Sequence, residues 1–125
     1  MNLSEKLKLL SDDNRLRIIN LILKEELCNC EIETILELSQ SNTSRHLSKM
    51  KGLEFFESYK DGNWVHYRIK KYENYAELIK FLQQEFKKEE IFVKDLERFK
   101  KYKKSGMTCT VIREDKEKVL NFLKR

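Results

Sequence analysis

Two helix patterns meet at a break of three residues near residue 38, and this spacing constrains the fold more than any other feature of the chain. The first pattern places Ile32 and Ile35 on one side of a helix that stops at Glu37-Leu38-Ser39. Ser39 is a good helix N-cap, so we expect the next helix to run from Gln40 to about Lys51. Two helices joined by so short a turn form a helix-turn-helix.

A β-hairpin is predicted directly after these helices. Residues 55–60 form a short, aromatic-rich run, and residues 64–69 consist of strand formers throughout. Asp61-Gly62 between them is a strong signal for a tight hairpin turn. The chain is therefore expected to be mainly α with a small β-hairpin, in the order of a winged helix-turn-helix.

Apolar periodicity outside this segment predicts further helices around one core. The first begins after Asn2 or Ser4, and the second runs from the cap formers 11–14 to about Lys24. Later helical patterns cover residues 75–86 and 91–99, with a kink or break between them, and a last helix covers residues 114–125. Residues 25–28 are expected to form a brief connection, and residues 108–112 an extended stretch. We expect residues 1–90 to form the winged domain, with residues 91–125 as a helical extension and tail packed on it.

Composition narrows the class of protein. The net charge of +5, from 26 basic and 21 acidic residues, is a mild excess that alone indicates little about partners. Three cysteines are an odd number, which argues against a disulfide framework. No apolar run approaches the roughly 20 residues of a membrane helix and no secretory signal is seen, so we expect a cytoplasmic protein without a membrane partner. The chain has only three glycines, no phosphate-binding glycine loop and no enzyme signature.

The helix from Gln40 to Lys51 has the chemistry of a DNA-reading element. It contains no acidic residue, carries Arg45 and Lys49, and shows a polar face that suits base edges and phosphates. A solvated amphipathic helix that happens to lack acids is the alternative for the helix alone, but the hairpin behind it favours DNA. The candidate contacts are Ser39, Gln40, Ser41, Asn42, Thr43, Ser44, Arg45, His46 and Lys49 on the helix, with Lys60, Asn63 and Arg68 on the hairpin.

Cys28 and Cys30 are separated by one residue, and two such thiolates suit a soft, thiophilic ion. Residues two apart on a helix point about 200° from each other, so both reach one ion only if Cys28 precedes the helix or its first turn distorts. Two small half-buried apolar residues are the alternative. A Cys28–Cys30 redox switch is disfavoured because the ring it closes is small and strained.

Four segments resemble, in order, those of the arsenical-resistance repressor (ArsR/SmtB) family. They are the opening Leu10–Ile18 (LSDDNRLRI), the metal-sensing segment Glu26–Ile32 (ELCNCEI), the recognition helix Leu38–Leu47 (LSQSNTSRHL) and the wing Asp61–Ile69 (DGNWVHYRI). The resemblance covers about residues 3–90. It implies a homodimer, joined through terminal helices, with DNA binding and dimerisation in residues 1–90. This dimer represses a promoter and leaves its operator DNA when a metal or metalloid binds.

The chain departs from the family's pattern at one position. Arsenite-sensing members often carry a third cysteine three residues after the second, where this chain has Glu33. We hypothesise that Cys109 supplies the third ligand, within one chain or across the dimer; an ordinary tail cysteine is the alternative. Residues 73–90 contain no histidine, which disfavours zinc, nickel or cobalt on that helix, and both His46 and His66 are assigned to DNA contact or packing.

Thiolate ligands favour arsenite or antimonite as the inducer, and cadmium or lead are the next candidates. The leading hypothesis is therefore a metalloid-responsive, dimeric transcriptional repressor. A winged-helix regulator with a thiol redox effector, or with no metal effector, is the alternative. A thiol-based metal-handling protein without a DNA function is the second alternative, and a gel shift on the upstream DNA separates it from both regulators.

Overall fold

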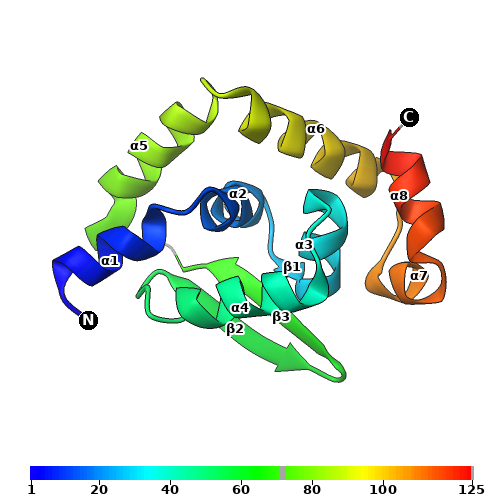
Figure 1. The fold of residues 1–125 in the computed structure, drawn as a ribbon, viewed down its shortest axis with the longest axis horizontal. Coiled ribbons are helices and arrows are strands. Elements are labelled where there is room, and N and C mark those ends of the chain that lie inside the picture. The colour runs from blue at the N-terminus through cyan, green and yellow to red at the C-terminus, as the bar shows by residue number, and fades with distance from the viewer. Residues whose placement is uncertain (71–72, 125) are drawn as a thin grey trace.

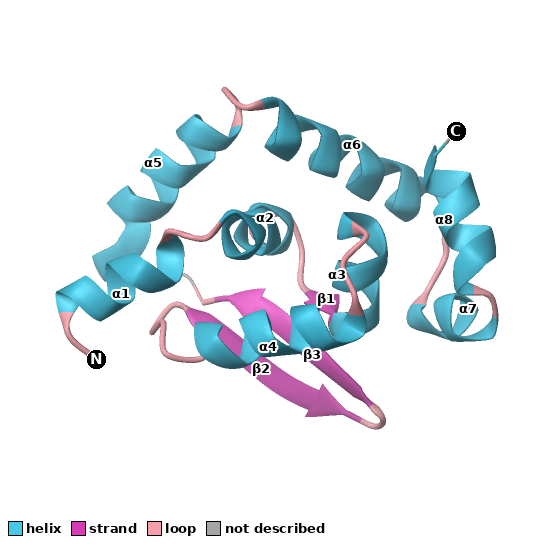
Figure 2. Cartoon of the chain, viewed as in Figure 1, coloured by secondary structure: helices cyan, strands magenta, loops and turns pink. Residues whose placement is uncertain are grey.

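The computed structural model describes residues 1–70 and 73–124. Its elements in chain order are α1 (Leu3–Leu10), α2 (Asp13–Ile22), β1 (Leu27–Cys28), α3 (Asn29–Leu36), α4 (Gln40–Met50), β2 (Phe56–Asp61), β3 (Trp64–Ile69), a 3-10 turn (Glu73–Tyr75), α5 (Ala76–Phe86), α6 (Glu90–Ser105), α7 (Cys109–Glu114) and α8 (Lys116–Lys124). The chain is mainly helical with a small antiparallel sheet at one side (Figures 1 and 2), as predicted.

The helix-turn-helix forms where the sequence predicts it, because local signals define both helix ends. Glu37 adopts a left-handed conformation (φ 56°) and ends α3. The Ser39 hydroxyl oxygen then accepts a hydrogen bond from the Asn42 amide at 3.2 Å and caps α4. Leu47 and Met50 of α4 are buried in the core and fix this helix against the rest of the domain.

The sheet contains one strand more than expected. Its order is β1-β3-β2, and Cys28 in β1 is the register partner of His66 in β3. Residues 25–28 were expected to be only a connection; a strand of two residues is too short to leave a periodic pattern, so that expectation was wrong. The hairpin turn also lies one residue later than Asp61-Gly62, because Asp61 pairs with Trp64 and Gly62 takes a φ of 61°.

Helices α5 and α6 arch over α2 in Figure 1, and buried polar contacts hold α6 to the helix-turn-helix. The Arg17 guanidinium in α2 donates to the Asp95 carboxylate in α6 at 2.7 Å, and Asp95 is only 3% exposed. Arg98 of α6 donates from Nε to the Ile35 carbonyl at the end of α3 at 2.6 Å. The end of α6 is thereby positioned beside α3, and the tail starts from there.

The tail differs from its predicted form. Residues 108–112 were expected to be extended, but all except Thr108 lie in the short helix α7, so this expectation was wrong. The run Thr-Cys-Thr-Val-Ile favours a strand by intrinsic propensity, and packing overrides it because Ile112 is buried in the core cluster. Helix α8 lies inside the predicted final helix, with Val119 and Leu123 buried.

No helix in the two described ranges combines the length and hydrophobicity needed to cross a bilayer.

Candidate functional site

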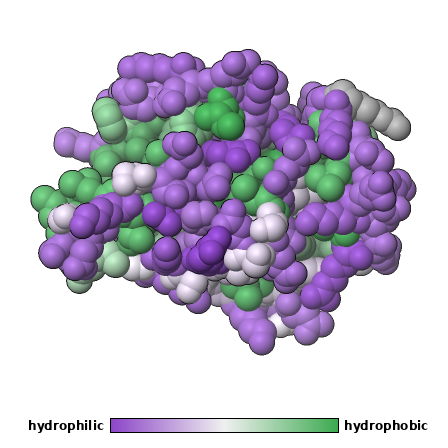
Figure 3. All heavy atoms as spheres, in the orientation of Figure 1, coloured by the Kyte–Doolittle hydropathy of each residue, from purple (hydrophilic) through white to green (hydrophobic). Residues whose placement is uncertain are grey.

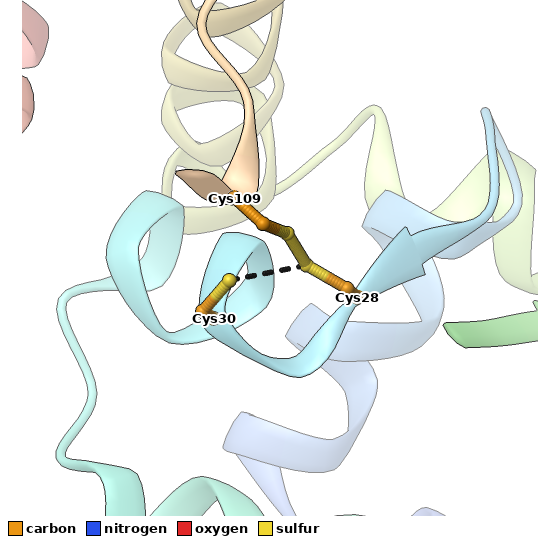
Figure 4. Close-up of side chains that lie close together, drawn as sticks. All are labelled: Cys28, Cys30 and Cys109. Carbon is orange, nitrogen blue, oxygen red and sulfur yellow. Dashed lines mark hydrogen bonds between the residues drawn. A yellow bond between two sulfur atoms is a disulfide. The ribbon is translucent and has the colours of Figure 1, made fainter. Parts of the chain in front are cut away.

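Three cysteine sulfurs meet at the start of α3. Cys28 ends β1, Cys30 lies in the first turn of α3, and Cys109 is the first residue of α7. Their Sγ atoms all lie within 4.8 Å of one another, and those of Cys28 and Cys30 are 3.2 Å apart. Figure 4 shows the three side chains pointing toward a common centre from separate segments. One chain thus brings together the three residues that the sequence selects as ligands.

Cys28 and Cys109 are joined as a disulfide, which differs from the expectation from the odd cysteine count. The odd count in a protein expected to be cytoplasmic argued against a disulfide framework, but one pair forms and leaves Cys30 as a free, buried thiol. The Cα atoms of Cys28 and Cys109 are 7.4 Å apart, beyond the usual disulfide range of about 4.4–6.8 Å. Thiols that bind a shared ion do not require their backbones to come within the shorter distance that is usual for a disulfide.

Cys28 and Cys30 converge because Cys28 precedes the helix. Its φ of −84° and ψ of 165° are extended, which removes the roughly 200° divergence of a regular helical pair. Glu31 holds this turn, since one carboxylate oxygen accepts a hydrogen bond from the Cys28 amide at 3.0 Å. The other Glu31 oxygen accepts a hydrogen bond from the hydroxyl group of Tyr102, a residue of α6 that is fully buried.

Glu31 and Tyr102 were missed in the sequence. Glu31 stands three residues after Cys28, the spacing of a capping box with cysteine in place of serine, and that pattern could have identified it. Tyr102 leaves no local signal, because its role depends on how α6 packs over α3.

The environment of Cys30 strongly disfavours its thiolate form. Burial raises its pKa to about 12, and the neighbouring Glu31 and Glu33 carboxylates act in the same direction. Cys30 is therefore a neutral thiol near pH 7, and an ion must displace its proton to bind. Only ions with a high affinity for sulfur meet that condition, so the environment selects against hard cations.

Glu33 occupies the place of the third cysteine in the resembled family, but it is not part of the sulfur cluster. Glu33 is 8% exposed, and its carboxylate lies 3.7 Å from Nζ of Lys116 in α8. Burial raises the pKa of Glu33, and Lys116 opposes that shift. Its Oε2 atom has no hydrogen-bond partner among the residues that the structure describes.

The outer face of α4 carries most of the residues expected to touch DNA. Ser39, Gln40, Ser41, Ser44, Arg45 and Lys49 are exposed, and Asn42 is partly so. Arg45 donates a hydrogen bond to the Asn42 side chain, which orients both on this surface.

Thr43 and His46 are corrections to the set of expected DNA contacts. Both are buried, since they share the inward stripe of α4 with Leu47 and Met50. The Thr43 hydroxyl donates to the Ser39 carbonyl at 2.9 Å, and Nδ1 of His46 lies 3.2 Å from the Arg15 guanidinium. Burial lowers the pKa of His46, with Arg15 among the smaller causes and Asp12 acting against them. These two residues hold α4 in place rather than facing a partner.

The hairpin presents Lys60 and Asn63 to solvent near its tip. Arg68 is exposed too, but it is paired with Glu57 at 3.2 Å and lies over the Tyr59 ring at 5.0 Å. His66 stacks on Tyr59 and is the strand partner of Cys28. The sulfur cluster is thus one strand pairing away from the wing.

Comparison with known proteins identifies the family. A model described as bacterial regulatory protein, arsR family, matches residues 12–58. The cadmium resistance transcriptional regulatory protein CadC of Listeria innocua is 47% identical over 64 residues, which are 50% of this chain and 54% of that protein. The arsenical resistance operon repressor of Escherichia coli is 44% identical over 64 residues, again 50% of this chain and 54% of that protein. The chain spans about half the length of these relatives.

Solved structures match over a larger share. The transcriptional regulator HlyU of Vibrio vulnificus is 30% identical with a TM-score of 0.56, over 65% of this chain and 83% of that one. A homodimeric winged helix-turn-helix DNA-binding domain of Mycobacterium bovis is 26% identical with a TM-score of 0.58, over 65% and 74%. The predicted fold is thereby confirmed, and the chain belongs to the arsR family of bacterial regulatory proteins.

Proposed function

We propose that the chain is a homodimeric transcriptional repressor that binds operator DNA and is released when a thiophilic ion binds Cys28, Cys30 and Cys109. The observation that carries this proposal is the meeting of three sulfurs within 4.8 Å at the start of α3, the helix that precedes the DNA-reading helix α4. Residues 1–90 carry DNA binding and dimerisation, and residues 91–125 deliver Cys109.

The DNA contacts come from the outer face of α4 and from the wing. They are Ser39, Gln40, Ser41, Asn42, Ser44, Arg45 and Lys49, with Lys60, Asn63 and Arg68 on the hairpin. Polar and cationic side chains on a helix of this kind read base edges in the major groove and hold phosphates.

Arsenite or antimonite is the inducer that the donor set favours. The Cys28–Cys109 disulfide must first be reduced, for example by two molecules of reduced glutathione that leave as oxidised glutathione. The three thiols and one neutral As(OH)₃ then give As(SR)₃ and three molecules of water. No histidine or carboxylate of the described residues joins the cluster, which disfavours ions that prefer nitrogen or oxygen. Relatives of this chain are named for cadmium and for arsenic, so cadmium stays the nearest competitor.

The cluster is connected to both parts of the DNA-reading surface. Cys28 pairs with His66 of the wing, and Cys30 lies on α3, whose end leads through Ser39 into α4. An ion that draws the sulfurs together shifts the wing relative to α4. A coupling of about 1–3 kcal/mol, usual in allostery, lowers DNA affinity about 5- to 150-fold.

The test is fluorescence anisotropy of the reduced protein on its own upstream DNA, followed by titration with arsenite, antimonite, cadmium and zinc. We expect sequence-specific binding and release by arsenite and antimonite at the lowest concentrations. Cys109→Ser should bind DNA normally and need at least about tenfold more arsenite for release.

Absence of a sequence-specific shift at moderate salt contradicts a regulatory function altogether. Unchanged arsenite release in the Cys109→Ser variant removes Cys109 from the site while leaving the repressor function in place.

A thiol redox effector is the second candidate, and the Cys28–Cys109 disulfide favours it. Oxidised glutathione would take up the two electrons and two protons of these thiols and leave as two molecules of reduced glutathione. The same DNA-binding assay includes it as one arm. Release by oxidised glutathione, reversed by a reductant and lost in Cys109→Ser, would support this candidate over the metalloid one if arsenite has no effect.

Dimerisation through α1 and α5 is part of the proposal. These helices carry exposed apolar side chains, with Leu3 at 71%, Leu7 at 55% and Phe81 at 55% exposure. Figure 3 shows hydrophobic side chains gathering at the edge of the molecule where α1 and α5 lie. Side chains this apolar and this exposed indicate a surface that a second subunit covers.

Replacing Phe81 by glutamate is expected to raise the dimer dissociation constant by about 100-fold or more, because the charge must be desolvated in an apolar contact. Sedimentation equilibrium measures this constant. Val93→Glu, an equally drastic change on the exposed side of α6, is the matched control and should leave the dimer intact. A Phe81→Glu variant that stays as dimeric as the control would contradict this interface.

A further inference from the structure

A cavity of about 330 Å³ opens between the DNA-reading helix, the wing and the C-terminal tail. Gln40, the first residue of α4, and Asn63 at the tip of the hairpin line it, as does Glu33 of α3. Arg113 of α7 and Lys116 of α8 belong to the same lining. The tail therefore carries two cations to the edge of the surface proposed to meet DNA.

The two cations differ in whether a carboxylate neutralises their charge. Lys116 faces the buried Glu33 carboxylate at 3.7 Å, so its charge is largely compensated. Arg113 is exposed, and the ion pairs found in residues 1–70 and 73–124 do not include it. Its guanidinium carbon instead lies over the Trp64 ring, 4.3 Å from the centroid, and this cation–π contact restrains the side chain.

We propose that Arg113 binds a backbone phosphate of the operator DNA, beside the N-terminus of α4. This inference rests on the proposed repressor function and extends its DNA surface into the tail. The planar guanidinium fork matches the oxygens of a phosphate, and Trp64 fixes the fork before DNA arrives. The α4 N-terminus adds amide groups and a favourable dipole for the same anion, with Gln40 and Asn63 as polar neighbours.

This contact links the sulfur cluster directly to DNA. Cys109 and Arg113 are the first and fifth residues of the same short helix, α7. An ion that changes where Cys109 sits must move Arg113 with it, because one helical turn separates them. Release of DNA then includes the loss of a phosphate contact as well as a shift of the wing.

The test compares Arg113→Gln with wild type by anisotropy on operator DNA over a range of salt concentrations. Glutamine keeps a polar stem on Trp64 and removes the charge. We expect at least roughly tenfold weaker binding and a slope of log K against log salt that is smaller by about two, because the homodimer loses one phosphate contact from each of its two subunits. Arg113→Lys should restore the slope. Lys118→Ala, an exposed cation of α8 outside the cavity, is the control and should leave the slope unchanged.

The outcomes separate the two proposals. Wild-type protein that fails to bind specific DNA contradicts the repressor function itself. Wild-type binding with an unchanged slope in Arg113→Gln overturns the phosphate contact alone. Inorganic phosphate at constant ionic strength provides one more arm: competition for Arg113 should weaken wild-type DNA binding and leave that of Arg113→Gln unchanged, whereas equal weakening of both proteins would contradict a phosphate contact by Arg113.

Discussion

Replacing Cys30 by serine is expected to raise the arsenite concentration needed for DNA release by more than about 100-fold, above the 10- to 100-fold usual for residues that only support a ligand. A serine hydroxyl does not replace a thiolate toward a soft ion. Cys30 is 7% exposed, and the cluster that holds it contains only the two other cysteines, Cys28 and Cys109, as sulfur ligands. DNA affinity without arsenite should change little, because serine is close to cysteine in size and the Cys28 turn is held by Glu31.

Glu33→Gln is the matched control for this experiment. Glu33 is a neighbour of Cys30 on the same helix and lies outside the sulfur cluster, so arsenite release should shift by less than about threefold. Titration of DNA release by arsenite measures both variants side by side. Normal arsenite release from Cys30→Ser, with the control unaffected, would show that Cys30 is not a ligand.

The parts of the site that the sequence predicted depend on short-range signals. Ser39 as the cap of α4 and the acid-free face of that helix are visible within a dozen residues. The argument that Cys28 must precede α3 if it is to reach Cys30 is local as well, and the backbone at Cys28 is extended. Each of these features is determined by residues that are close together in the sequence.

What the sequence left open depends on contacts between distant segments. That Cys109 reaches Cys28 within one chain depends on α6 lying over α2 and α3, through pairs such as Arg17 with Asp95. The burial of His46 and its contact with Arg15 on another helix give no local pattern either. Strand β1 exists only because β3 is there to pair with it.

The pH dependence of ion binding is expected to distinguish arsenite from cadmium. Cadmium must expel the proton of each thiol it binds, and the pKa of Cys30 is raised to about 12, so this thiol stays protonated throughout the neutral range. From Cys30 alone, cadmium affinity should therefore rise about tenfold per pH unit, roughly 100-fold between pH 6 and pH 8. Arsenite behaves differently, because the protons of the thiols leave with its own hydroxyl groups as water. Its affinity should change by less than about threefold over the same range.

The measurement is competition for the reduced protein against a chelator of known pH dependence, with DNA release as an independent readout. Cys30→Ser is the control, since it should lose the steep cadmium dependence that belongs to that buried thiol. A flat cadmium profile in the wild type would mean that cadmium does not displace the Cys30 proton, and a steep arsenite profile would contradict condensation of As(OH)₃ with three thiols. Because the two ions differ in proton balance rather than in size or softness, the contrast between the two profiles tests the ligand chemistry separately from the choice of physiological inducer.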